Sequence, residues 1–192
     1  QVYRYANGID QDPVAPPDPT RKGYGNSITL AQDVSDFDTA SQVLLALSET
    51  VGARLREAGV RCNSVTVELK DWRFTSQSHQ CVLKNPTDST SVLYDTACRL
   101  LKEFWDKTPV RLIGLRTSQI QEDPFEQMSL FEDERQKKMQ AMEKAVDHIR
   151  GRYGIDSVQR ASFLKENSPT PHAVSRKKHL NQTSQHNTGK EF

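Results

Sequence analysis

The sequence predicts an α+β fold in which two helices cover one face of a four-stranded, mostly antiparallel sheet. In SVTVELK at 64–70 every second residue is apolar, which is typical of a strand with one buried face. Two stretches with apolar residues every three or four positions predict amphipathic helices, and the element order is strand, helix, strand, strand, helix, strand. Helices on one side leave the other sheet face open, and its occupants would be Thr, Ser, Gln, Arg and Lys. An open polar face indicates a polar partner.

The first segments are predicted as follows. The beginning of the chain resembles the end of a helix that stops at Gly8. Four prolines between 13 and 19 exclude a helix interior and a central strand, so this segment is predicted to be a linker with some polyproline II stiffness. A short strand is expected at 27–30.

The next elements form the centre of the predicted domain. The first amphipathic helix begins where Ser35 and Asp38 form a capping box, and it ends at Gly59. After the alternating strand, a second strand at 73–84 is polar enough that one of its faces must be solvated or covered by something polar. The second helix runs to about Asp106, and its expected buried residues are Leu93, Ala97, Leu100, Leu101 and Phe104.

The last elements lie beyond this centre. A strand at 110–119 interrupts its alternation near Gly114, which indicates a bulge or a close approach of another backbone. An acidic loop leads to a helix at about 133–152, and its apolar stripe consists of Met139, Met142, Val146, Ile149 and Tyr153. From Lys165 onward the chain lacks the apolar content needed to offset the entropy of ordering, so disorder is predicted.

Composition and charge limit the classes of protein. A formal net charge of +1, from 26 Lys+Arg and 25 Asp+Glu, says nothing about nucleic acid, but 117–134 holds six acids and no Lys or Arg. No apolar run approaches a membrane span, and no signal peptide is expected. The three cysteines lack CxxC spacing, which fits a reducing cytoplasm rather than a disulfide framework or a zinc site. Because the chain begins with Gln inside a predicted folded segment, we expect it to be a fragment of a longer protein.

The motifs of common enzyme classes are missing from the sequence. There is no phosphate-binding glycine loop, no HExxH, no GxSxG and no pair of carboxylates placed on a strand for a divalent metal. His172, His179 and His186 recur every seven residues, but no Cys or carboxylate converges on them, so we assign them no metal role. Any catalysis is expected outside this chain.

Basic residues near the predicted sheet are more informative. Arg21 and Lys22 enter the first strand, Arg73 falls in the third, and Arg111 and Arg116 fall in the fourth. Any one of them is best explained as part of a solvated face. Together with interleaved Ser, Thr, Gln and Gly they have the chemistry that binds phosphates. The sequence has no aromatic-rich platform for single-stranded bases, so the duplex backbone is the expected partner.

Several segments carry a resemblance to a known family. YANGID followed by PV, RKGYGNSITLAQDV, SVTVELKD and PVRLIGLRTSQI resemble, in the same order, the C-terminal third of a Y-family DNA polymerase. The type is DNA polymerase IV or UmuC-like, of the ImpB/MucB/SamB UV-damage repair group. AVDHIRGRYGIDSVQRASFL additionally resembles the C-terminal segment of UV-damage repair proteins from Gram-positive bacteria and their plasmids and phages.

The resemblance implies a division of the chain and a set of partners. The division is 1–12 as the end of the thumb, 13–24 as the tether, 25–119 as the little-finger DNA-binding domain, 120–132 as the acidic loop with a clamp-binding motif, 133–164 as the C-terminal helical segment and 165–192 as a disordered tail. The little finger would grip duplex primer–template DNA. Palm carboxylates, which these 192 residues lack, would bind two Mg²⁺ ions and perform nucleotidyl transfer in translesion, error-prone synthesis during the SOS response to DNA damage. No cofactor is expected in the fragment itself.

The resemblance also implies which residues meet the DNA. They are Arg21, Lys22, Tyr24, Gly25, Asn26, Ser27, Arg73, Ser76, Gln77, Arg111 and Arg116. Gln77 stands where relatives often carry Arg, which leaves that contact open.

The segment QMSLF at 127–131 resembles the clamp-binding peptide of bacterial polymerases. Leu130 and Phe131 would fill an apolar pocket on the sliding clamp (the beta subunit), Met128 would add contact, and Gln127 would supply a directional hydrogen bond. The alternative is that Leu130 and Phe131 begin the next helix and pack on it.

Two other functions stay open. One is a non-catalytic DNA-binding accessory protein with a clamp peptide, which palm carboxylates upstream of Gln1 would exclude. The other is a protein-interaction module, whose binding would not fall with salt as phosphate contacts do. A monomer without membrane association is expected.

Overall fold

A computed structural model describes residues 2–9, 22–122 and 134–164, and the predicted α+β fold is confirmed within them. The helices and strands are α1 (Val2–Ala6), β1 (Gly23–Val34), α2 (Phe37–Glu57), β2 (Val60–Asp71), β3 (Ser76–Thr87), α3 (Thr90–Phe104), β4 (Val110–Glu122) and α4 (Glu134–Tyr153). Two short 3-10 helices follow, η1 (Ile155–Ser157) and η2 (Ala161–Leu164).

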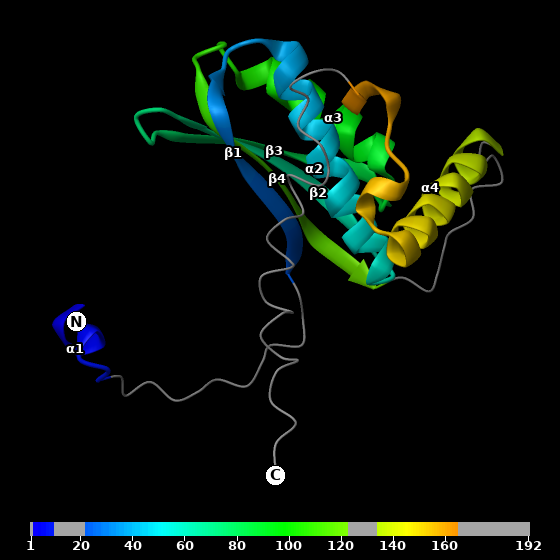
Figure 1. Cartoon of the computed structure of the whole chain (residues 1–192), viewed down its shortest axis with the longest axis horizontal. Coiled ribbons are helices and arrows are strands. Elements are labelled where there is room, and N and C mark those ends of the chain that lie inside the picture. Colours follow the sequence, from blue (N-terminus) through cyan, green and yellow to red (C-terminus); the bar gives the residue numbers. More distant parts are fainter. Residues whose placement is uncertain (1, 10–21, 123–133, 165–192) are drawn as a thin grey trace.

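The strands form one sheet in the order β1-β4-β2-β3, and all neighbouring strands are antiparallel. β4 and β2 therefore lie in the centre, β1 and β3 form the edges, and α2 and α3 cover one face (Figure 1). β1 is much longer than the strand predicted at 27–30, because its glycine-rich start pairs with β4 from Gly23 onward. Pairing with a distant strand is not visible in local composition.

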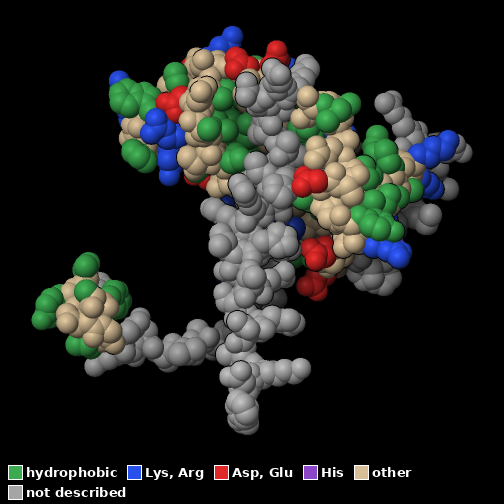
Figure 2. Space-filling model, viewed as in Figure 1, with side chains coloured by type: hydrophobic (Ala, Val, Ile, Leu, Met, Phe, Trp, Pro, Cys, Tyr) green, Lys and Arg blue, Asp and Glu red, His purple; other side chains and the backbone are tan. Residues whose placement is uncertain are grey.

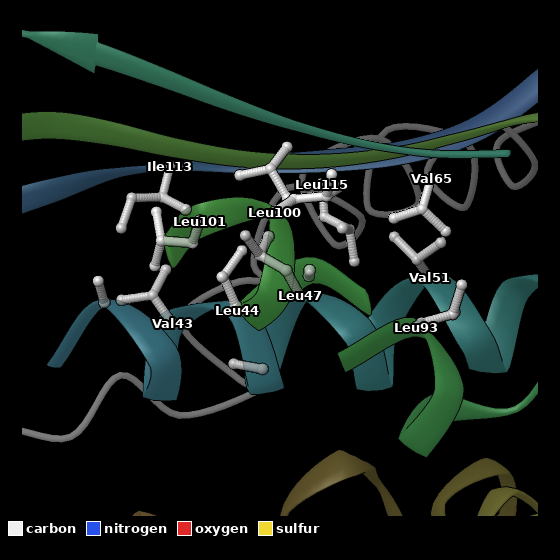
Figure 3. Close-up of a cluster of buried hydrophobic side chains, with 14 of the residues drawn as sticks. Val43, Leu44, Leu47, Val51, Val65, Leu93, Leu100, Leu101, Ile113 and Leu115 are labelled. Carbon is white, nitrogen blue, oxygen red and sulfur yellow. The ribbon is translucent and has the colours of Figure 1, made fainter. Parts of the chain in front are cut away.

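The core lies between the sheet and the two helices (Figure 3). Its largest members, each at most 1% exposed, are Val43, Leu44, Leu47, Val51 and Leu55 of α2, Leu93, Leu100 and Leu101 of α3, and Val65, Val67, Ile113 and Leu115 of the strands. Full burial of one such side chain contributes about 1.5–3 kcal/mol. Phe104, which was also predicted to be buried, is only partly so and stacks on His79 with ring centroids 5.6 Å apart.

The cap of α2 differs from the prediction by one residue. The N-cap is Asp36, not Ser35, and its Oδ1 accepts a hydrogen bond from the backbone N–H of Thr39 at 2.7 Å. This bond holds the pKa of Asp36 below its ordinary value. Both Ser and Asp cap helices well, so the cap is decided by where the chain turns after β1. At the other end Gly59, with φ +66°, follows the helix as predicted.

Gly114 marks a close backbone approach and not a bulge. The register of β4 against β2 continues without interruption from Leu112 to Thr117. A Cβ added at Gly114 would lie 3.3 Å from the Cβ of Ser27 and 3.5 Å from that of Glu68. The register shift that β2 and β4 do show lies beside Arg111, at the end of the sheet.

Only part of the predicted apolar stripe of α4 lies on the face that packs on the domain, because Met139 and Val146 are half-buried and the other three members are exposed. Met142, Ile149 and Tyr153 are 45%, 38% and 68% exposed, whereas Glu143 is 4% exposed. Hydrophobic side chains accordingly gather on the surface over α4 (Figure 2). The stripe is divided between the packed and the exposed side of the helix because the most buried residue of α4, Glu143, is charged.

Glu143 makes the central contacts of α4. Arg56 of α2 pairs with Glu143 at 3.3 Å and also with Asp147. Glu143 Oε1 accepts a hydrogen bond from the backbone N–H of Thr90 at 3.0 Å, and the N-cap residue of α3, Ser89, makes no capping bond of its own. A carboxylate from α4 thus caps α3. Burial raises the pKa of Glu143, although Arg56 acts in the opposite direction.

A second ionic cluster holds the end of the described chain. Glu49 of α2 pairs with Arg150 at 3.0 Å and with Arg160. Phe163 of η2, 3% exposed, joins the core. Residues 134–164 are therefore attached to the domain by two groups of ion pairs and a buried ring.

Candidate nucleic-acid interface

The sheet face opposite α2 and α3 carries polar side chains and glycines. Because Val65, Val67 and Leu69 point into the core, Thr66 and Glu68 point to the opposite face. The register places two rows across this face, Gly25–Arg116–Thr66–Gln80 and Ser27–Gly114–Glu68–Ser78. The polar open face expected from the sequence is present.

This face is hollowed into a groove with a volume of about 1030 Å³. The groove brings together most of the residues that the resemblance assigns to DNA and that the structure describes. Those that line it are Lys22, Tyr24, Gly25, Asn26, Ser27, Ser76, Gln77 and Arg116.

Arg116 is the exposed cation in the middle of the groove, and glycine makes room for it. A Cβ added at Gly25 would lie 3.2 Å from the Cβ and Cγ of Arg116. Any side chain at Gly25 would therefore push against the aliphatic stem of Arg116.

The two glycines beside it keep the floor of the groove flat. A Cβ at Gly23 would meet the carbonyl oxygen of Thr117 at 2.2 Å, so the backbones of β1 and β4 tolerate no side chain there. Gly114 is less crowded, because a Cβ there would lie 3.3 Å from the Cβ of Ser27 and 3.5 Å from that of Glu68. A sheet floor without side chains lets another backbone approach closely.

Arg54 is a groove residue that the sequence analysis missed. It reaches from α2 to the edge strand β1, where its Nη1 donates to the carbonyl oxygen of Gly25 at 2.9 Å. Its guanidinium also lies 5.6 Å from the ring centroid of Tyr24. Nothing in the local sequence of α2 marks this residue, because its partners lie 29 and 30 positions earlier in the chain.

Glu68 is a second residue that the sequence analysis did not assign to the site. It lies in the row Ser27–Gly114–Glu68–Ser78 of the open face, between Gly114 and Ser78. Its Oε2 would be 3.7 Å from a Cβ built at Gly114, so the carboxylate lies over the glycine floor. A negative charge in this place opposes the binding of a polyanion.

Three predicted DNA residues occupy unexpected places. Tyr24 is 5% exposed and its ring belongs to the core. Arg111 lies at the end of the sheet, where its Nε donates to Asp33 Oδ1 at 3.0 Å, and it does not line the groove. Arg73 is in the turn between β2 and β3 and not in a strand, because β3 begins only at Ser76.

Five other predicted site residues lie outside the described residues. They are Arg21 and the clamp-motif residues Gln127, Met128, Leu130 and Phe131. Their assignments stay predictions.

The chemistry of the groove suits a polyanion that lies across the sheet. Lys22, Arg54 and Arg116 supply positive charge, while Ser, Thr, Gln and Asn side chains supply positioning hydrogen bonds.

Comparison with known proteins assigns the family. A family model described as "impB/mucB/samB family C-terminal domain" matches residues 21–130, which is more than half of the chain. The chain therefore belongs to the impB/mucB/samB family and carries its C-terminal domain. The resemblance to the C-terminal part of Y-family DNA polymerases is confirmed by this match.

Curated relatives agree with the family. The chain is 38% identical to "DNA polymerase IV 2" of Bacillus subtilis over 169 residues, covering 85% of this chain and 40% of the relative. It is 32% identical to "DNA polymerase IV" of Clostridium acetobutylicum over 165 residues, covering 86% of this chain and 42% of the relative. The chain thus spans about two fifths of the length of these relatives.

Solved structures with related folds are more distant. One is a complex of beta-clamp processivity factor and little finger domain of PolIV, with a TM-score of 0.45 and 22% identity over 56% of this chain and 97% of that chain. Another is DinB from Sulfolobus solfataricus, with a TM-score of 0.45 and 19% identity over 61% of this chain and 33% of that chain.

Proposed function

We propose that the groove binds the phosphate backbone of duplex DNA and that the chain is the DNA-gripping part of a translesion polymerase. The observation that carries the proposal is the exposed Arg116 above a glycine floor, flanked by Lys22 and Arg54. The sheet that carries the groove is long enough for such a ligand, because the 12 residues of β2 span ~36 Å at ~3.3 Å per residue, about one turn of duplex DNA.

Arg116→Ala tests the groove. Loss of one phosphate contact should weaken duplex binding and make the slope of log K against log salt shallower by about one unit. Fluorescence anisotropy with a labelled blunt duplex at several salt concentrations measures both quantities. The matched control is Arg99→Ala, which removes the same charge from α3 on the helix-covered side of the sheet.

The control should leave affinity and slope almost unchanged. Equal effects of the two substitutions would mean that only net charge matters, and the groove would lose its assignment. Arg111→Ala belongs in the same series. Its pairing with Asp33 predicts a smaller effect than that of Arg116→Ala.

The names of the relatives favour a polymerase over a non-catalytic accessory protein as the parent. In the parent, nucleotidyl transfer and the two Mg²⁺ ions belong to a palm domain that precedes the part described here. Among residues 2–9, 22–122 and 134–164, no three His, Cys, Asp or Glu side chains come together as metal ligands. For this chain we propose a role in DNA grip and clamp recruitment during synthesis past damaged template bases in the SOS response.

The segment QMSLF at 127–131 is proposed to bind the sliding clamp. It lies between the end of β4 at Glu122 and the start of α4 at Glu134, both of which belong to the folded domain. Replacement of Leu130 and Phe131 by Ala should abolish binding to purified clamp, because two apolar side chains supply most of the contact. Surface plasmon resonance measures the loss, and duplex affinity should not change. Retained clamp affinity would remove the assignment.

The cellular setting proposed for the chain is the bacterial cytoplasm, as a monomer. No helix of the described segments is long and apolar enough to cross a membrane. The three cysteines, Cys62, Cys81 and Cys98, are free thiols, and burial raises the pKa of Cys62 to about 11. Sedimentation of the chain alone tests the monomer.

A further inference from the structure

The turn between β2 and β3 exposes two aromatic side chains that the groove does not use. Trp72 is 50% exposed and Phe74 is 73% exposed. Arg73 lies between them in sequence, with its guanidinium carbon 4.7 Å from the centroid of the Trp72 ring. Hydrophobic and basic side chains gather at this end of the hairpin, which projects from the sheet (Figures 1 and 2).

The turn is held rigidly in a conformation that is costly for Phe74. Its φ is 65°, a region that Gly adopts freely and that a bulky residue adopts at a cost of about 1–2 kcal/mol. Asp71 fixes the turn. Its carbonyl oxygen accepts from the N–H of Phe74 at 3.1 Å, and its Oδ1 accepts from the N–H of Thr75 at 2.8 Å. Folding gains little from two rings that remain half or more exposed, and together with Arg73 they offer faces on which a planar ligand can stack.

The position of the turn indicates which ligand. The groove reaches the base of the hairpin, because Ser76, Gln77 and Ser78 line it. At the opposite end of the sheet, Val60 at the start of β2 pairs with Glu122 at the end of β4. β4, which precedes the segment proposed to bind the clamp, therefore ends at one end of the sheet, and the aromatic turn stands at the other end, ~36 Å away for a strand of 12 residues.

A clamp encircles finished duplex, so the end of the groove away from the clamp faces DNA that has not yet been copied. That DNA is single-stranded, and its unstacked bases expose faces that aromatic rings and Arg guanidinium groups bind by stacking. We infer that Trp72 and Phe74 stack on unpaired bases of the template strand ahead of the duplex, with Arg73 beside them. This inference rests on the proposed function, because it takes the groove as the duplex site.

The experiment compares two DNA ligands, a blunt duplex and the same duplex with an unpaired 5′ extension of the template strand. Affinity is measured by fluorescence anisotropy with the 192-residue chain. Trp72→Ala and Phe74→Gly should each weaken binding of the tailed duplex about tenfold and leave the blunt duplex unchanged. Phe74→Gly also removes the strain at a positive φ, so this variant should unfold at a higher temperature than the wild type even though it binds the tail less well.

Tyr153→Ala is the matched control, because Tyr153 is an exposed aromatic residue on α4, 68% exposed. It should change neither affinity. Direct contact is tested in a Trp105→Phe background, where Trp72 is the remaining tryptophan. The tailed duplex should quench its fluorescence and the blunt duplex should not.

The failures of this inference and of the proposed function give different results. If the turn variants weaken neither DNA while Arg116→Ala still weakens both, the stacking assignment alone is overturned. Equal weakening on both DNAs also overturns it, because the turn would then contact duplex. A wild-type chain that binds neither DNA would overturn the proposed function and the stacking assignment together.

Discussion

On the helix side of the sheet, Val65, Val67 and Leu69 of β2 are at most 3% exposed, whereas Thr66 and Glu68 of the same strand line an open groove. One strand therefore serves two environments by alternation alone. On the helix side the side chains are large and apolar and stabilise the fold by burial. On the open side they are small, polar or absent, and contribute a surface that another molecule can approach. Burial on one face and the proposed binding on the other thus depend on different residues, and substitutions can test how cleanly the two separate.

The largest effect is expected from a matched pair of valines, one on each face. Val65 is fully buried on β2, and Val82 is 57% exposed on β3, where it pairs with Ser64. Val65→Ala should lower the free energy of unfolding by about 2–3 kcal/mol, because it removes buried methyl groups and leaves a cavity. Val82→Ala should change it by less than about 0.5 kcal/mol. Urea denaturation measures both, and similar losses would show that the open face also carries part of the core.

A smaller effect is expected where Glu143 of α4 contacts α2 and the first turn of α3. Glu143→Ala removes the acceptor for the N–H of Thr90 and a partner of Arg56. We expect a local loss of about 1–2 kcal/mol, because Arg56 keeps Asp147 and the carbonyl oxygen of Asp88. Hydrogen exchange should become faster in α4 and in the first turn of α3, while β2 and β4 keep their protection. Faster exchange throughout the sheet would contradict a local role.

The same residue gives the pH dependence of α4 docking. Burial raises the pKa of Glu143 above its ordinary value of 4.5, so the folded state holds this proton more tightly than the unfolded state. Its contribution to stability is therefore complete below pH 4.5 and is lost as the pH rises through the raised pKa. Glu143→Gln keeps an acceptor oxygen but cannot ionise, so exchange rates in α4 should depend less on pH above 4.5 in this variant than in the wild type.

Periodicity predicted the helix side well. Alternation placed Val65, Val67 and Leu69 on one face, and helical spacing placed Leu93, Leu100 and Leu101 in the core, because burial of apolar surface is the dominant local signal. The same rule was only partly right for α4, where Met139 and Val146 are half-buried and Met142, Ile149 and Tyr153 are exposed. That helix docks through Glu143, whose partner Arg56 lies 87 positions away, and no local pattern reports such a partner.

The open face was predicted as a surface but not in all its members. Charge and small polar residues indicated Arg116 correctly as a groove residue, yet Tyr24 lies in the core and Arg111 pairs with Asp33, 78 positions away. Arg54 entered the groove from a helix that the sequence assigned to the other side. Residue type predicts what a side chain can bind, whereas its neighbours across the sheet decide whether it is available.

The smallest effect is expected for Glu68, the acidic residue on the open face, and it tests where DNA would lie on that face. Glu68 lies over Gly114 in the groove, and a carboxylate ~8 Å from a phosphate repels it by about 0.5 kcal/mol in water. Glu68→Gln keeps the shape of the side chain and removes the charge, so duplex affinity should rise two- to fivefold at low salt. The gain should shrink as salt screens the repulsion.

Glu103→Gln provides the matched control for this substitution. Glu103 is an exposed acid on α3, on the helix side, and its replacement changes the net charge by the same amount. If affinity depended only on net charge, both variants would bind more tightly to the same degree, and the open face would have no special role. A gain confined to Glu68→Gln would place the DNA over the row of the open face that contains Glu68. Electrostatic repulsion falls with distance and is screened beyond ~10 Å at 0.1 M salt. Glu68 would then limit how tightly the isolated domain holds DNA, so that attachment during synthesis depends on additional contacts elsewhere in the protein.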